Sequence, residues 1–159
     1  MTSALEGRSI VVTGSGRGIG AEVAKLIGSQ GANVIVNDPG VNVDRSGTDS
    51  APAEQVAQEI RDAGGTASAN FDSVATADGG ESMITQCVDE FGRIDGVVHV
   101  AGILRDRMVF NMTEEEWDDV VAVHLTGLFN VVKPASILFR QQRFGRIVGF
   151  SSGSGMNGN

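Results

Sequence analysis

The stretch that decides the fold is Ile10-Val11-Val12-Thr13-Gly14-Ser15-Gly16-Arg17-Gly18-Ile19-Gly20. Its apolar start predicts a short buried strand, and the segment that follows the glycines, residues 18–30, predicts a helix that ends at Gly31. A glycine-rich turn between a buried strand and a helix is typical of a binding site for the pyrophosphate of a dinucleotide. The alternative is an ordinary glycine-rich turn that binds nothing.

The glycines of this turn have separate physical roles. Gly14 allows a tight turn, Gly18 lets the backbone come close to the pyrophosphate, and Gly20 lets the helix pack closely. The start of the helix adds free N–H groups and a partial positive charge. The other residues of the turn that we expect to bind the cofactor are Gly16, Arg17 and Ile19.

Strand and helix patterns alternate beyond this turn. Further strands are predicted at residues 32–37, 66–71, 97–100 and 146–150, and further helices at 53–63, 80–91 and from 113 onward, with a long polar loop at 39–50. This alternation predicts an α/β fold, a Rossmann-type doubly wound parallel sheet whose first five strands have helices on both faces. Residues 1–159 are interpreted as one dinucleotide-binding domain.

The periodicity of two helices predicts which side chains face the core. In the first helix these are Ile19, Val23, Leu26 and Ile27. In the longest helix the predicted stripe is Trp117, Val120, Val121, His124, Leu125 and Leu128. Thr113 and Glu116 form a capping box at its start, and Pro134 is expected to kink or end it.

Composition and charge exclude several classes of function. The net charge of −8, without any basic run, argues against a nucleic-acid partner. No apolar run of membrane-spanning length and no signal peptide are visible, so we expect no membrane partner and a cytoplasmic protein, with a peroxisomal location left open. The single cysteine fits a reducing compartment. No residues have metal-ligand spacing, and we predict no metal.

The choice between NAD and NADP rests on two residues. Asp38 follows the second predicted strand, where a carboxylate can accept hydrogen bonds from both hydroxyls of the adenosine ribose and repels a 2′-phosphate. Arg17 favours the opposite choice, because a basic residue in the glycine turn can bind that phosphate. We predict NAD as the cofactor, with NADP as the alternative.

Residues 13–20 match the pattern Thr-Gly-x-x-x-Gly-x-Gly, and through this pattern the whole chain resembles the short-chain dehydrogenase/reductase family. The resemblance implies that Asp72, followed by Ser73, holds the adenine. It also implies that His99-Val100-Ala101-Gly102 replaces an Asn-Asn-Ala-Gly element beside the cofactor, which makes His99, Ala101 and Gly102 cofactor-binding residues. His99 is also open to interpretation as a purely structural replacement.

The same resemblance implies the catalytic residues. The family's catalytic serine matches Ser152, which would donate to the substrate oxygen, and its active-site Asn aligns with His124. Two plainer interpretations are a turn-capping serine and a core histidine. The family's Tyr-x-x-x-Lys pair would fall just beyond Asn159, and the chain contains no Tyr. We therefore expect the domain to be incomplete at its C-terminal end and inactive by itself.

Gly102-Ile103-Leu104-Arg105-Asp106-Arg107 and Asn37-Asp38-Pro39-Gly40 are similar to the (3R)-hydroxyacyl-CoA dehydrogenase unit of peroxisomal multifunctional enzymes of type 2. This resemblance implies hydride transfer between NAD and a secondary alcohol of a 3-hydroxyacyl-CoA. It also implies an acyl-CoA-like small-molecule partner and a homodimer or homotetramer. The alternatives are an NADP-linked 3-ketoacyl reductase and a non-catalytic dinucleotide-binding protein.

Overall fold

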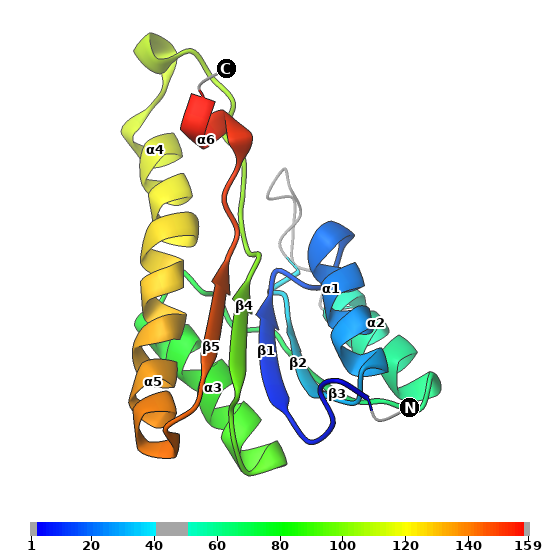
Figure 1. Cartoon of the computed structure of the whole chain (residues 1–159). Coiled ribbons are helices and arrows are strands. Elements are labelled where there is room, and N and C mark those ends of the chain that lie inside the picture. Colours follow the sequence, from blue (N-terminus) through cyan, green and yellow to red (C-terminus); the bar gives the residue numbers. More distant parts are fainter. Residues whose placement is uncertain (1–2, 41–50, 158–159) are drawn as a thin grey trace.

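A computed structural model describes residues 3–40 and 51–157, which form a parallel five-stranded sheet between two layers of helices (Figure 1). The strand order is β3-β2-β1-β4-β5. The strands are β1 (Ser9–Thr13), β2 (Asn33–Asn37), β3 (Thr66–Asn70), β4 (Gly96–His99) and β5 (Arg146–Gly149). The helices are α1 (Gly18–Ser29), α2 (Ala51–Asp62), α3 (Ala77–Phe91), η1 (Val109–Asn111), α4 (Glu114–Val121), η2 (Ala122–Thr126), α5 (Gly127–Gln142) and α6 (Gly153–Asn157). The predicted α/β fold is confirmed.

Alternate residues of the strands supply two separate cores, one on each face of the sheet. Val12 and Val34 pack against α1 and α2, whereas Val11 and Ile35 pack against α3 and α5. This division follows from the strand repeat, in which successive side chains point to opposite faces. Because both faces are covered, the middle of each central strand is a continuous apolar run, such as residues 10–12 of β1 and 34–36 of β2, as is typical of parallel sheets.

The periodicity of the first helix predicts its core face in part: Val23 and Ile27 pack against the core, whereas the other two predicted residues do not. Ile19 and Leu26 are exposed at 65% and 63%, and the buried residues of α1 are Gly20, Ala21, Ala24 and Gly28. A Cβ on Gly28 would lie 2.7 Å from the side chain of Ile60 on α2. Small residues therefore face inward because α1 approaches α2 and the sheet too closely for larger side chains.

The long helical segment starts as the sequence predicts but changes its geometry after two turns. Thr113 caps α4 and forms the predicted capping box with Glu116. A π-helical segment, η2, then separates α4 from α5. Such a segment adds a residue to one turn and rotates every later side chain about the axis. The predicted continuous core stripe is wrong: Trp117, which precedes this segment, and Leu125, which lies within it, are 60% and 69% exposed.

Pro134 does not end the long helix, since it lies inside α5. Proline removes the hydrogen bond that the carbonyl of residue i−4, here Asn130, would accept. That carbonyl lies against α3 instead, because a Cβ on Gly80 would come within 2.5 Å of its oxygen. Burial of Val131 and Ala135 against the sheet and α3 keeps the helix in place on both sides of the proline.

Two other elements differ slightly from the predicted ones. Thr76 caps α3, which begins three residues before the predicted start. Residues 153–157 form the short helix α6, which no pattern in the sequence predicts. The predicted loop at 39–50 falls mostly outside the described residues.

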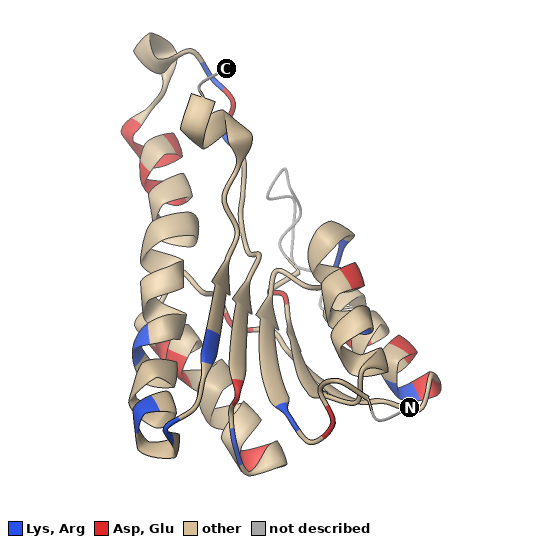
Figure 2. Ribbon diagram, in the orientation of Figure 1, with Lys and Arg blue, Asp and Glu red and all other residues tan. Residues whose placement is uncertain are grey.

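The helical run Glu114–Gln142 is long and apolar enough, by length and composition, to span a membrane. Its first turn carries three glutamates and α5 packs on α3, so we assign it to the helical layer (Figure 2).

Asp95 joins the two halves of the sheet at the amino ends of the strands. Its carboxylate accepts hydrogen bonds from Arg8 at 2.9 Å, from Arg93 at 2.6 and 2.7 Å, and from the backbone N–H of Ser9 at 3.1 Å. Burial acts to raise the pKa of Asp95, but these donors outweigh it and the pKa is lowered. The carboxylate thus connects the chain before β1 to the chain before β4.

Cys87, the single cysteine, lies in the core between α3 and the sheet. It is fully buried, and its thiol donates to the backbone carbonyl of Arg93 at 3.5 Å. Burial, assisted by the nearby carboxylates of Asp95 and Glu90, raises the pKa of the thiol to about 12. Cys87 is therefore a packing residue that stays protonated in the folded protein.

Candidate functional site

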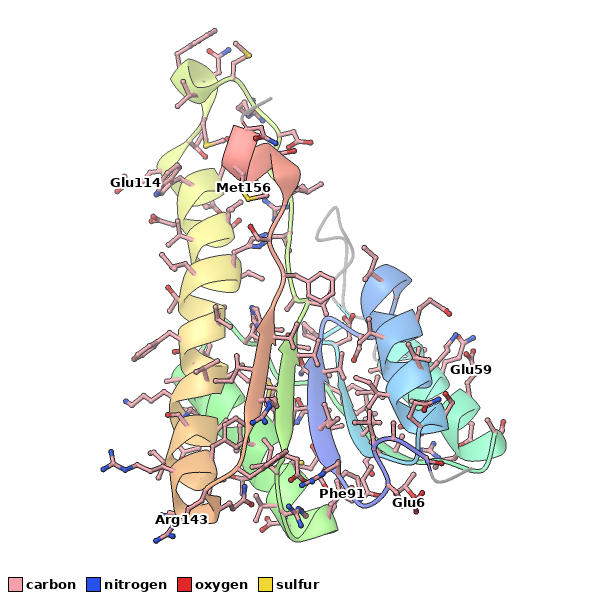
Figure 3. The ribbon with its side chains drawn as sticks, viewed as in Figure 1. Glu6, Glu59, Phe91, Glu114, Arg143 and Met156 are labelled. Carbon is pink, nitrogen blue, oxygen red and sulfur yellow. The ribbon has the colours of Figure 1, made fainter. Side chains whose placement is uncertain are left out.

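The sequence-predicted site residues follow the carboxyl ends of all five strands. Gly14 comes after β1, Asp38 after β2, Asp72 after β3, Ala101 after β4 and Ser152 after β5. Figure 3 shows the same end of the molecule, where Met156 on α6 lies above the strands and opposite Phe91 and Arg143. The chain leaves β1 toward β2 and β3 on one side and returns to β4 on the other. In open α/β sheets, ligands bind at this switch point.

The glycine turn after β1 has a conformation and surroundings that only glycines permit. Gly14 has a φ of +63°, and a Cβ on it would lie 2.6 Å from the Cα of Ala101. A Cβ on Gly20 would overlap the carbonyl oxygen of Gly14. The absence of a side chain at Gly20 therefore lets α1 pack directly against the glycine turn, rather than against the sheet itself. Gly18 has a φ of +55°, and nothing lies within 4 Å of its Cβ position. Gly18 therefore faces open space, where a ligand can approach the backbone.

The start of α1 is suited to an anion. The N–H groups of the first helical turn have no partners within the helix and carry a partial positive charge. No side chain caps this terminus, and no acidic residue lies in the first turn. The exposed Arg17 stands at the N-cap and adds a full positive charge. This terminus thus offers donors and positive charge to a pyrophosphate.

Asp38 is held beside the glycine turn by two backbone N–H groups. Its Oδ2 accepts from Gly16 at 3.1 Å and its Oδ1 accepts from Gly40 at 2.9 Å. A Cβ on Gly16 would lie 2.9 Å from the carboxylate, so the absence of a side chain there allows this contact. Each oxygen retains a lone pair that can accept from a ribose hydroxyl. The carboxylate is therefore oriented before any ligand binds.

A polar network continues from β2 to the end of β3. The amide of Asn37 donates to Asn70 at 2.7 Å and to the carbonyl of Asp72 at 2.8 Å. Asp72 accepts in turn from Asn70 at 3.1 Å and from Ser82 at 2.7 Å. Asp72 and Ser73 are exposed, so they remain accessible to an adenine. The fully buried Asn37 also keeps its Oδ1 without a partner among the described residues.

The ends of β1 and β4 are joined by a side-chain contact as well as by the backbone pairing of the sheet. Thr13 and His99 are paired in the sheet, and Thr13 Oγ1 lies 3.0 Å from His99 Nδ1. The same hydroxyl accepts from the backbone N–H of Ala101 at 3.3 Å. His99 is buried, and the burial lowers its pKa. The predicted residue His99 thus lies beneath the glycine turn, and Ala101 lies against it.

His124 is exposed on the π-helical segment, so the alternative of a core histidine is wrong. Its Nε2 lies 2.9 Å from the carbonyl oxygen and 3.1 Å from the backbone nitrogen of Ile103. Gly102 makes this approach possible, because a Cβ there would lie 2.5 Å from His124 Cε1. The loop after Gly102 is joined to α4 by ion pairs from Arg105 to Asp119 and from Arg107 to Glu116.

Ser152 is exposed just after β5, next to the end of β4. The backbone N–H of Phe150 donates to the carbonyl of His99 at 3.1 Å, which fixes this segment beside β4. Ser152 Oγ accepts from the backbone N–H of Ser154 at 3.2 Å, as a turn-capping serine does. Its hydroxyl proton remains available to donate to a ligand. No hydrogen bond joins Ser152 to His124 in residues 3–40 and 51–157.

No group of three or more His, Cys, Asp or Glu that could hold a metal ion is found within the described ranges. The absence of a metal remains a prediction.

Sequence reasoning missed three features of the site. The contact of His99 with Thr13 is not predicted, and neither is the network around Asn37. A polar residue within the apolar run 34–37 is the one signal that could have identified Asn37. Nothing in the local sequence marks residues 122–126 as π-helical.

The fold and the site define the class of the chain as a doubly wound α/β protein with a dinucleotide-type site at its switch point. The family model described as short chain dehydrogenase matches residues 8–159. The chain belongs to the short-chain dehydrogenase/reductase family.

Three similar proteins illustrate this membership. A short-chain type dehydrogenase/reductase of Mycobacterium tuberculosis is 49% identical over 98% of this chain and 54% of its own length. The peroxisomal multifunctional enzyme type 2 of Mus musculus is 45% identical over 97% of this chain and 20% of its own length. The crystal structure of a short chain dehydrogenase from Mycobacterium avium superimposes with a TM-score of 0.89 at 41% identity, covering 98% of this chain and 56% of that one. The chain thus spans about half the length of two of these proteins and a fifth of the third.

Proposed function

We propose that the protein is an NAD-dependent oxidoreductase that interconverts a secondary alcohol and a ketone, with a 3-hydroxyacyl-CoA as its substrate. The glycine turn and the start of α1 would bind the pyrophosphate, Asp38 the adenosine ribose, and Asp72 and Ser73 the adenine. When bound, the dinucleotide supplies the hydride acceptor. The 159-residue chain by itself is proposed to bind NAD without turning over substrate.

The observation that carries the choice of NAD is the orientation of Asp38. Its carboxylate receives N–H groups from Gly16 and Gly40, and both oxygens keep accepting capacity. A phosphate on the ribose would meet this fixed negative charge at close range, where repulsion is strong. Arg17, exposed at the helix start, supports the alternative of an NADP-linked 3-ketoacyl reductase.

The substrate proposal depends on the similarity to a peroxisomal multifunctional enzyme, together with Ser152 and His124. Ser152 has a hydroxyl proton to donate to a substrate oxygen, which would polarise the carbonyl and stabilise negative charge on it. His124 is exposed beside Ile103 and would contact the substrate. Both residues would orient the substrate, while proton abstraction requires a further base.

Titration of the intact natural protein with NAD and NADP in a calorimeter tests the cofactor. We expect NAD to bind at least tenfold more tightly, and Asp38→Ala to weaken NAD binding by about tenfold or more, as loss of a hydrogen bond to a charged group does. Asp89→Ala, an exposed change on α3, is the matched control and should leave both affinities unchanged. Tighter binding of NADP would contradict the proposal.

Oxidation assays with NAD and with the (3R) and (3S) isomers of a 3-hydroxyacyl-CoA test the substrate. We expect turnover of the (3R) isomer and a loss of about a hundredfold in kcat for Ser152→Ala. A protein that binds NAD but oxidises no 3-hydroxyacyl-CoA would support the non-catalytic alternative.

We also propose that the protein forms a homodimer or homotetramer, which ultracentrifugation would measure. We propose a cytoplasmic location, with a peroxisomal location as the alternative.

A further inference from the structure

Three residues hold Asp72 in place at the carboxyl end of β3. Ser82 Oγ on α3 donates to Asp72 Oδ2 at 2.7 Å, and Asn70 Nδ2 donates to the same oxygen at 3.1 Å. The backbone N–H of Asp72 donates to Asn70 Oδ1 at 3.1 Å, and its backbone carbonyl accepts from Asn37 Nδ2 at 2.8 Å. Asp72 is thus held through one carboxylate oxygen and through both of its backbone polar groups.

The hydrogen bonds of Asn70 fix which way its amide group faces. Its Nδ2 donates one proton to Asp72 and the other to Gln86 Oε1 at 2.9 Å, while its Oδ1 accepts from Asn37 at 2.7 Å. An amide group has two N–H donors, so both protons of Asn70 are used. Rotation of the amide by a half turn would place its oxygen against the carboxylate of Asp72. Asn70 therefore presents a donor, and not an acceptor, to Asp72.

Ser82 lies one turn before Gln86 on the face of α3 that meets the end of β3. Gln86 accepts from Asn70, and its Nε2 donates to the backbone carbonyl of Ala69 at 3.0 Å. Residues four apart share one face of a helix, so these contacts of Gln86 also place Ser82 beside β3. Ser82 is exposed, and in the described part of the chain its hydroxyl makes a single hydrogen bond, the one to Asp72. The role of Ser82 is therefore tied to this carboxylate and not to packing.

The second carboxylate oxygen of Asp72, Oδ1, has no hydrogen-bond partner among residues 3–40 and 51–157. Asp72 is exposed, so this oxygen is accessible to a ligand. A carboxylate can only accept hydrogen bonds. An amino group at C6 of a purine donates to such an oxygen, whereas a carbonyl at C6 would bring two acceptors together. The free oxygen therefore favours a 6-amino purine over a 6-oxo purine.

We propose that Ser82 is a positioning residue for the adenine: together with Asn70 it occupies Oδ2 of Asp72, so that Oδ1 alone accepts from the exocyclic amino group of the base. Without the hydroxyl of Ser82, Oδ2 is held by Asn70 only, and the carboxylate rotates more freely. This inference rests on the proposed function, in which Asp72 binds the adenine. It adds that α3, through one hydroxyl group, determines how strongly the site distinguishes adenine from a 6-oxo purine.

Calorimetric titration of the intact natural protein with NAD and with nicotinamide hypoxanthine dinucleotide, which carries a 6-oxo purine, tests this selectivity. We expect the unmodified protein to bind NAD about tenfold more tightly. Ser82→Ala should lower this ratio by about fivefold, the effect of one lost hydrogen bond. Ser82→Thr keeps the hydroxyl and should restore the ratio.

Thr85→Ala is the matched control, because Thr85 is exposed on the same helix and its hydroxyl makes no hydrogen bond in the described part of the chain. This variant should leave the ratio of the two affinities unchanged. A merely structural role of Ser82 would weaken the binding of both dinucleotides equally, and that result would overturn the proposal. Equal affinities for the two dinucleotides in the unmodified protein would overturn it as well.

Crystal structures of the unmodified protein and of Ser82→Ala, both without a dinucleotide, test the orientation of Asp72 separately. We expect one side-chain conformation of Asp72 in the unmodified protein and an additional one in Ser82→Ala. The same single conformation in both structures would overturn the proposal. Alanine favours helix formation, so Ser82→Ala should fold, which thermal unfolding verifies. An intact protein that binds neither NAD nor NADP would instead refute the proposed function, and the two structures would still decide whether Ser82 orients Asp72.

Discussion

The two halves of the site are built in different ways. Around β1 and β2, backbone contacts position the groups: Gly14 packs on Ala101, and Asp38 receives two N–H groups. The half around β4 and β5 relies on side chains on loops and on a π-helical segment, and every residue of β5 is exposed. The residues proposed to bind the dinucleotide are therefore held by main-chain contacts and by the buried core. The residues proposed to contact the substrate are held by a few polar side-chain contacts.

The largest effect is expected where the two halves touch, at Gly14. The Cβ of Gly14→Ala would lie 2.6 Å from the Cα and 2.7 Å from the nitrogen of Ala101, both main-chain atoms, at a φ of +63°. We expect a loss of about 4 kcal/mol in the free energy of unfolding, from overpacking and strain together, and no dinucleotide binding.

Gly7→Ala is the matched control for Gly14→Ala. Gly7 has a φ of +71°, but nothing lies within 4 Å of its Cβ position. Backbone strain alone should cost about 1 kcal/mol. Urea denaturation measures both variants, and a similar loss in the two would mean that the contact with Ala101 can relax.

A second comparison tests the difference between the buried and the exposed strands. Ile35 on β2 is fully buried and Ile147 on β5 is 45% exposed. Ile35→Ala should cost about 3 kcal/mol, because it removes core contacts and leaves a cavity. Ile147→Ala should cost about 1 kcal/mol, because less apolar surface is buried there. Urea denaturation of the intact natural protein is the measurement, and a cost for Ile147→Ala that equals that for Ile35→Ala would show that β5 is covered there.

After Gly14→Ala and Ile35→Ala, the next smaller loss of stability is expected at Asp95, which connects the two halves of the sheet at its opposite edge. Because its pKa is lowered in the folded state, its contribution to stability is present above the ordinary pKa of 3.8 and is lost as the pH falls through the lower folded value. Asp95→Asn should cost about 2 kcal/mol at neutral pH, and the difference from the unmodified protein should shrink below about pH 4.

Denaturation curves from pH 2 to 7 measure this dependence on Asp95. Arg93→Met, which removes two of the hydrogen bonds to the carboxylate, should reduce the same acid dependence in part. A constant difference between Asp95→Asn and the unmodified protein over the whole range would contradict the assignment.

The sequence predicts the sheet, its helices and the strand ends that carry the site, because buried parallel strands and glycine turns leave clear local patterns. It predicts side-chain burial less well. Trp117 on α4 and Leu125 in the π-helical segment are exposed, because the repeat of apolar residues along a helix does not reveal which face the rest of the chain covers. Ile19 is exposed because tight packing selects small residues on α1. The roles of Ser152 and His124 stay predictions, since they depend on a substrate.

The buried thiol of Cys87 gives the molecule an internal reporter of its own opening. With a pKa of about 12 and no exposure, it should resist alkylating reagents while α3 stays docked. Its rate of modification then measures how often the α3 layer separates from the sheet, independently of any ligand assay. A nucleotide that binds the folded protein should slow the modification of Cys87, although the thiol lies in the core and not in the site. The decrease in the modification rate would then report the free energy of nucleotide binding.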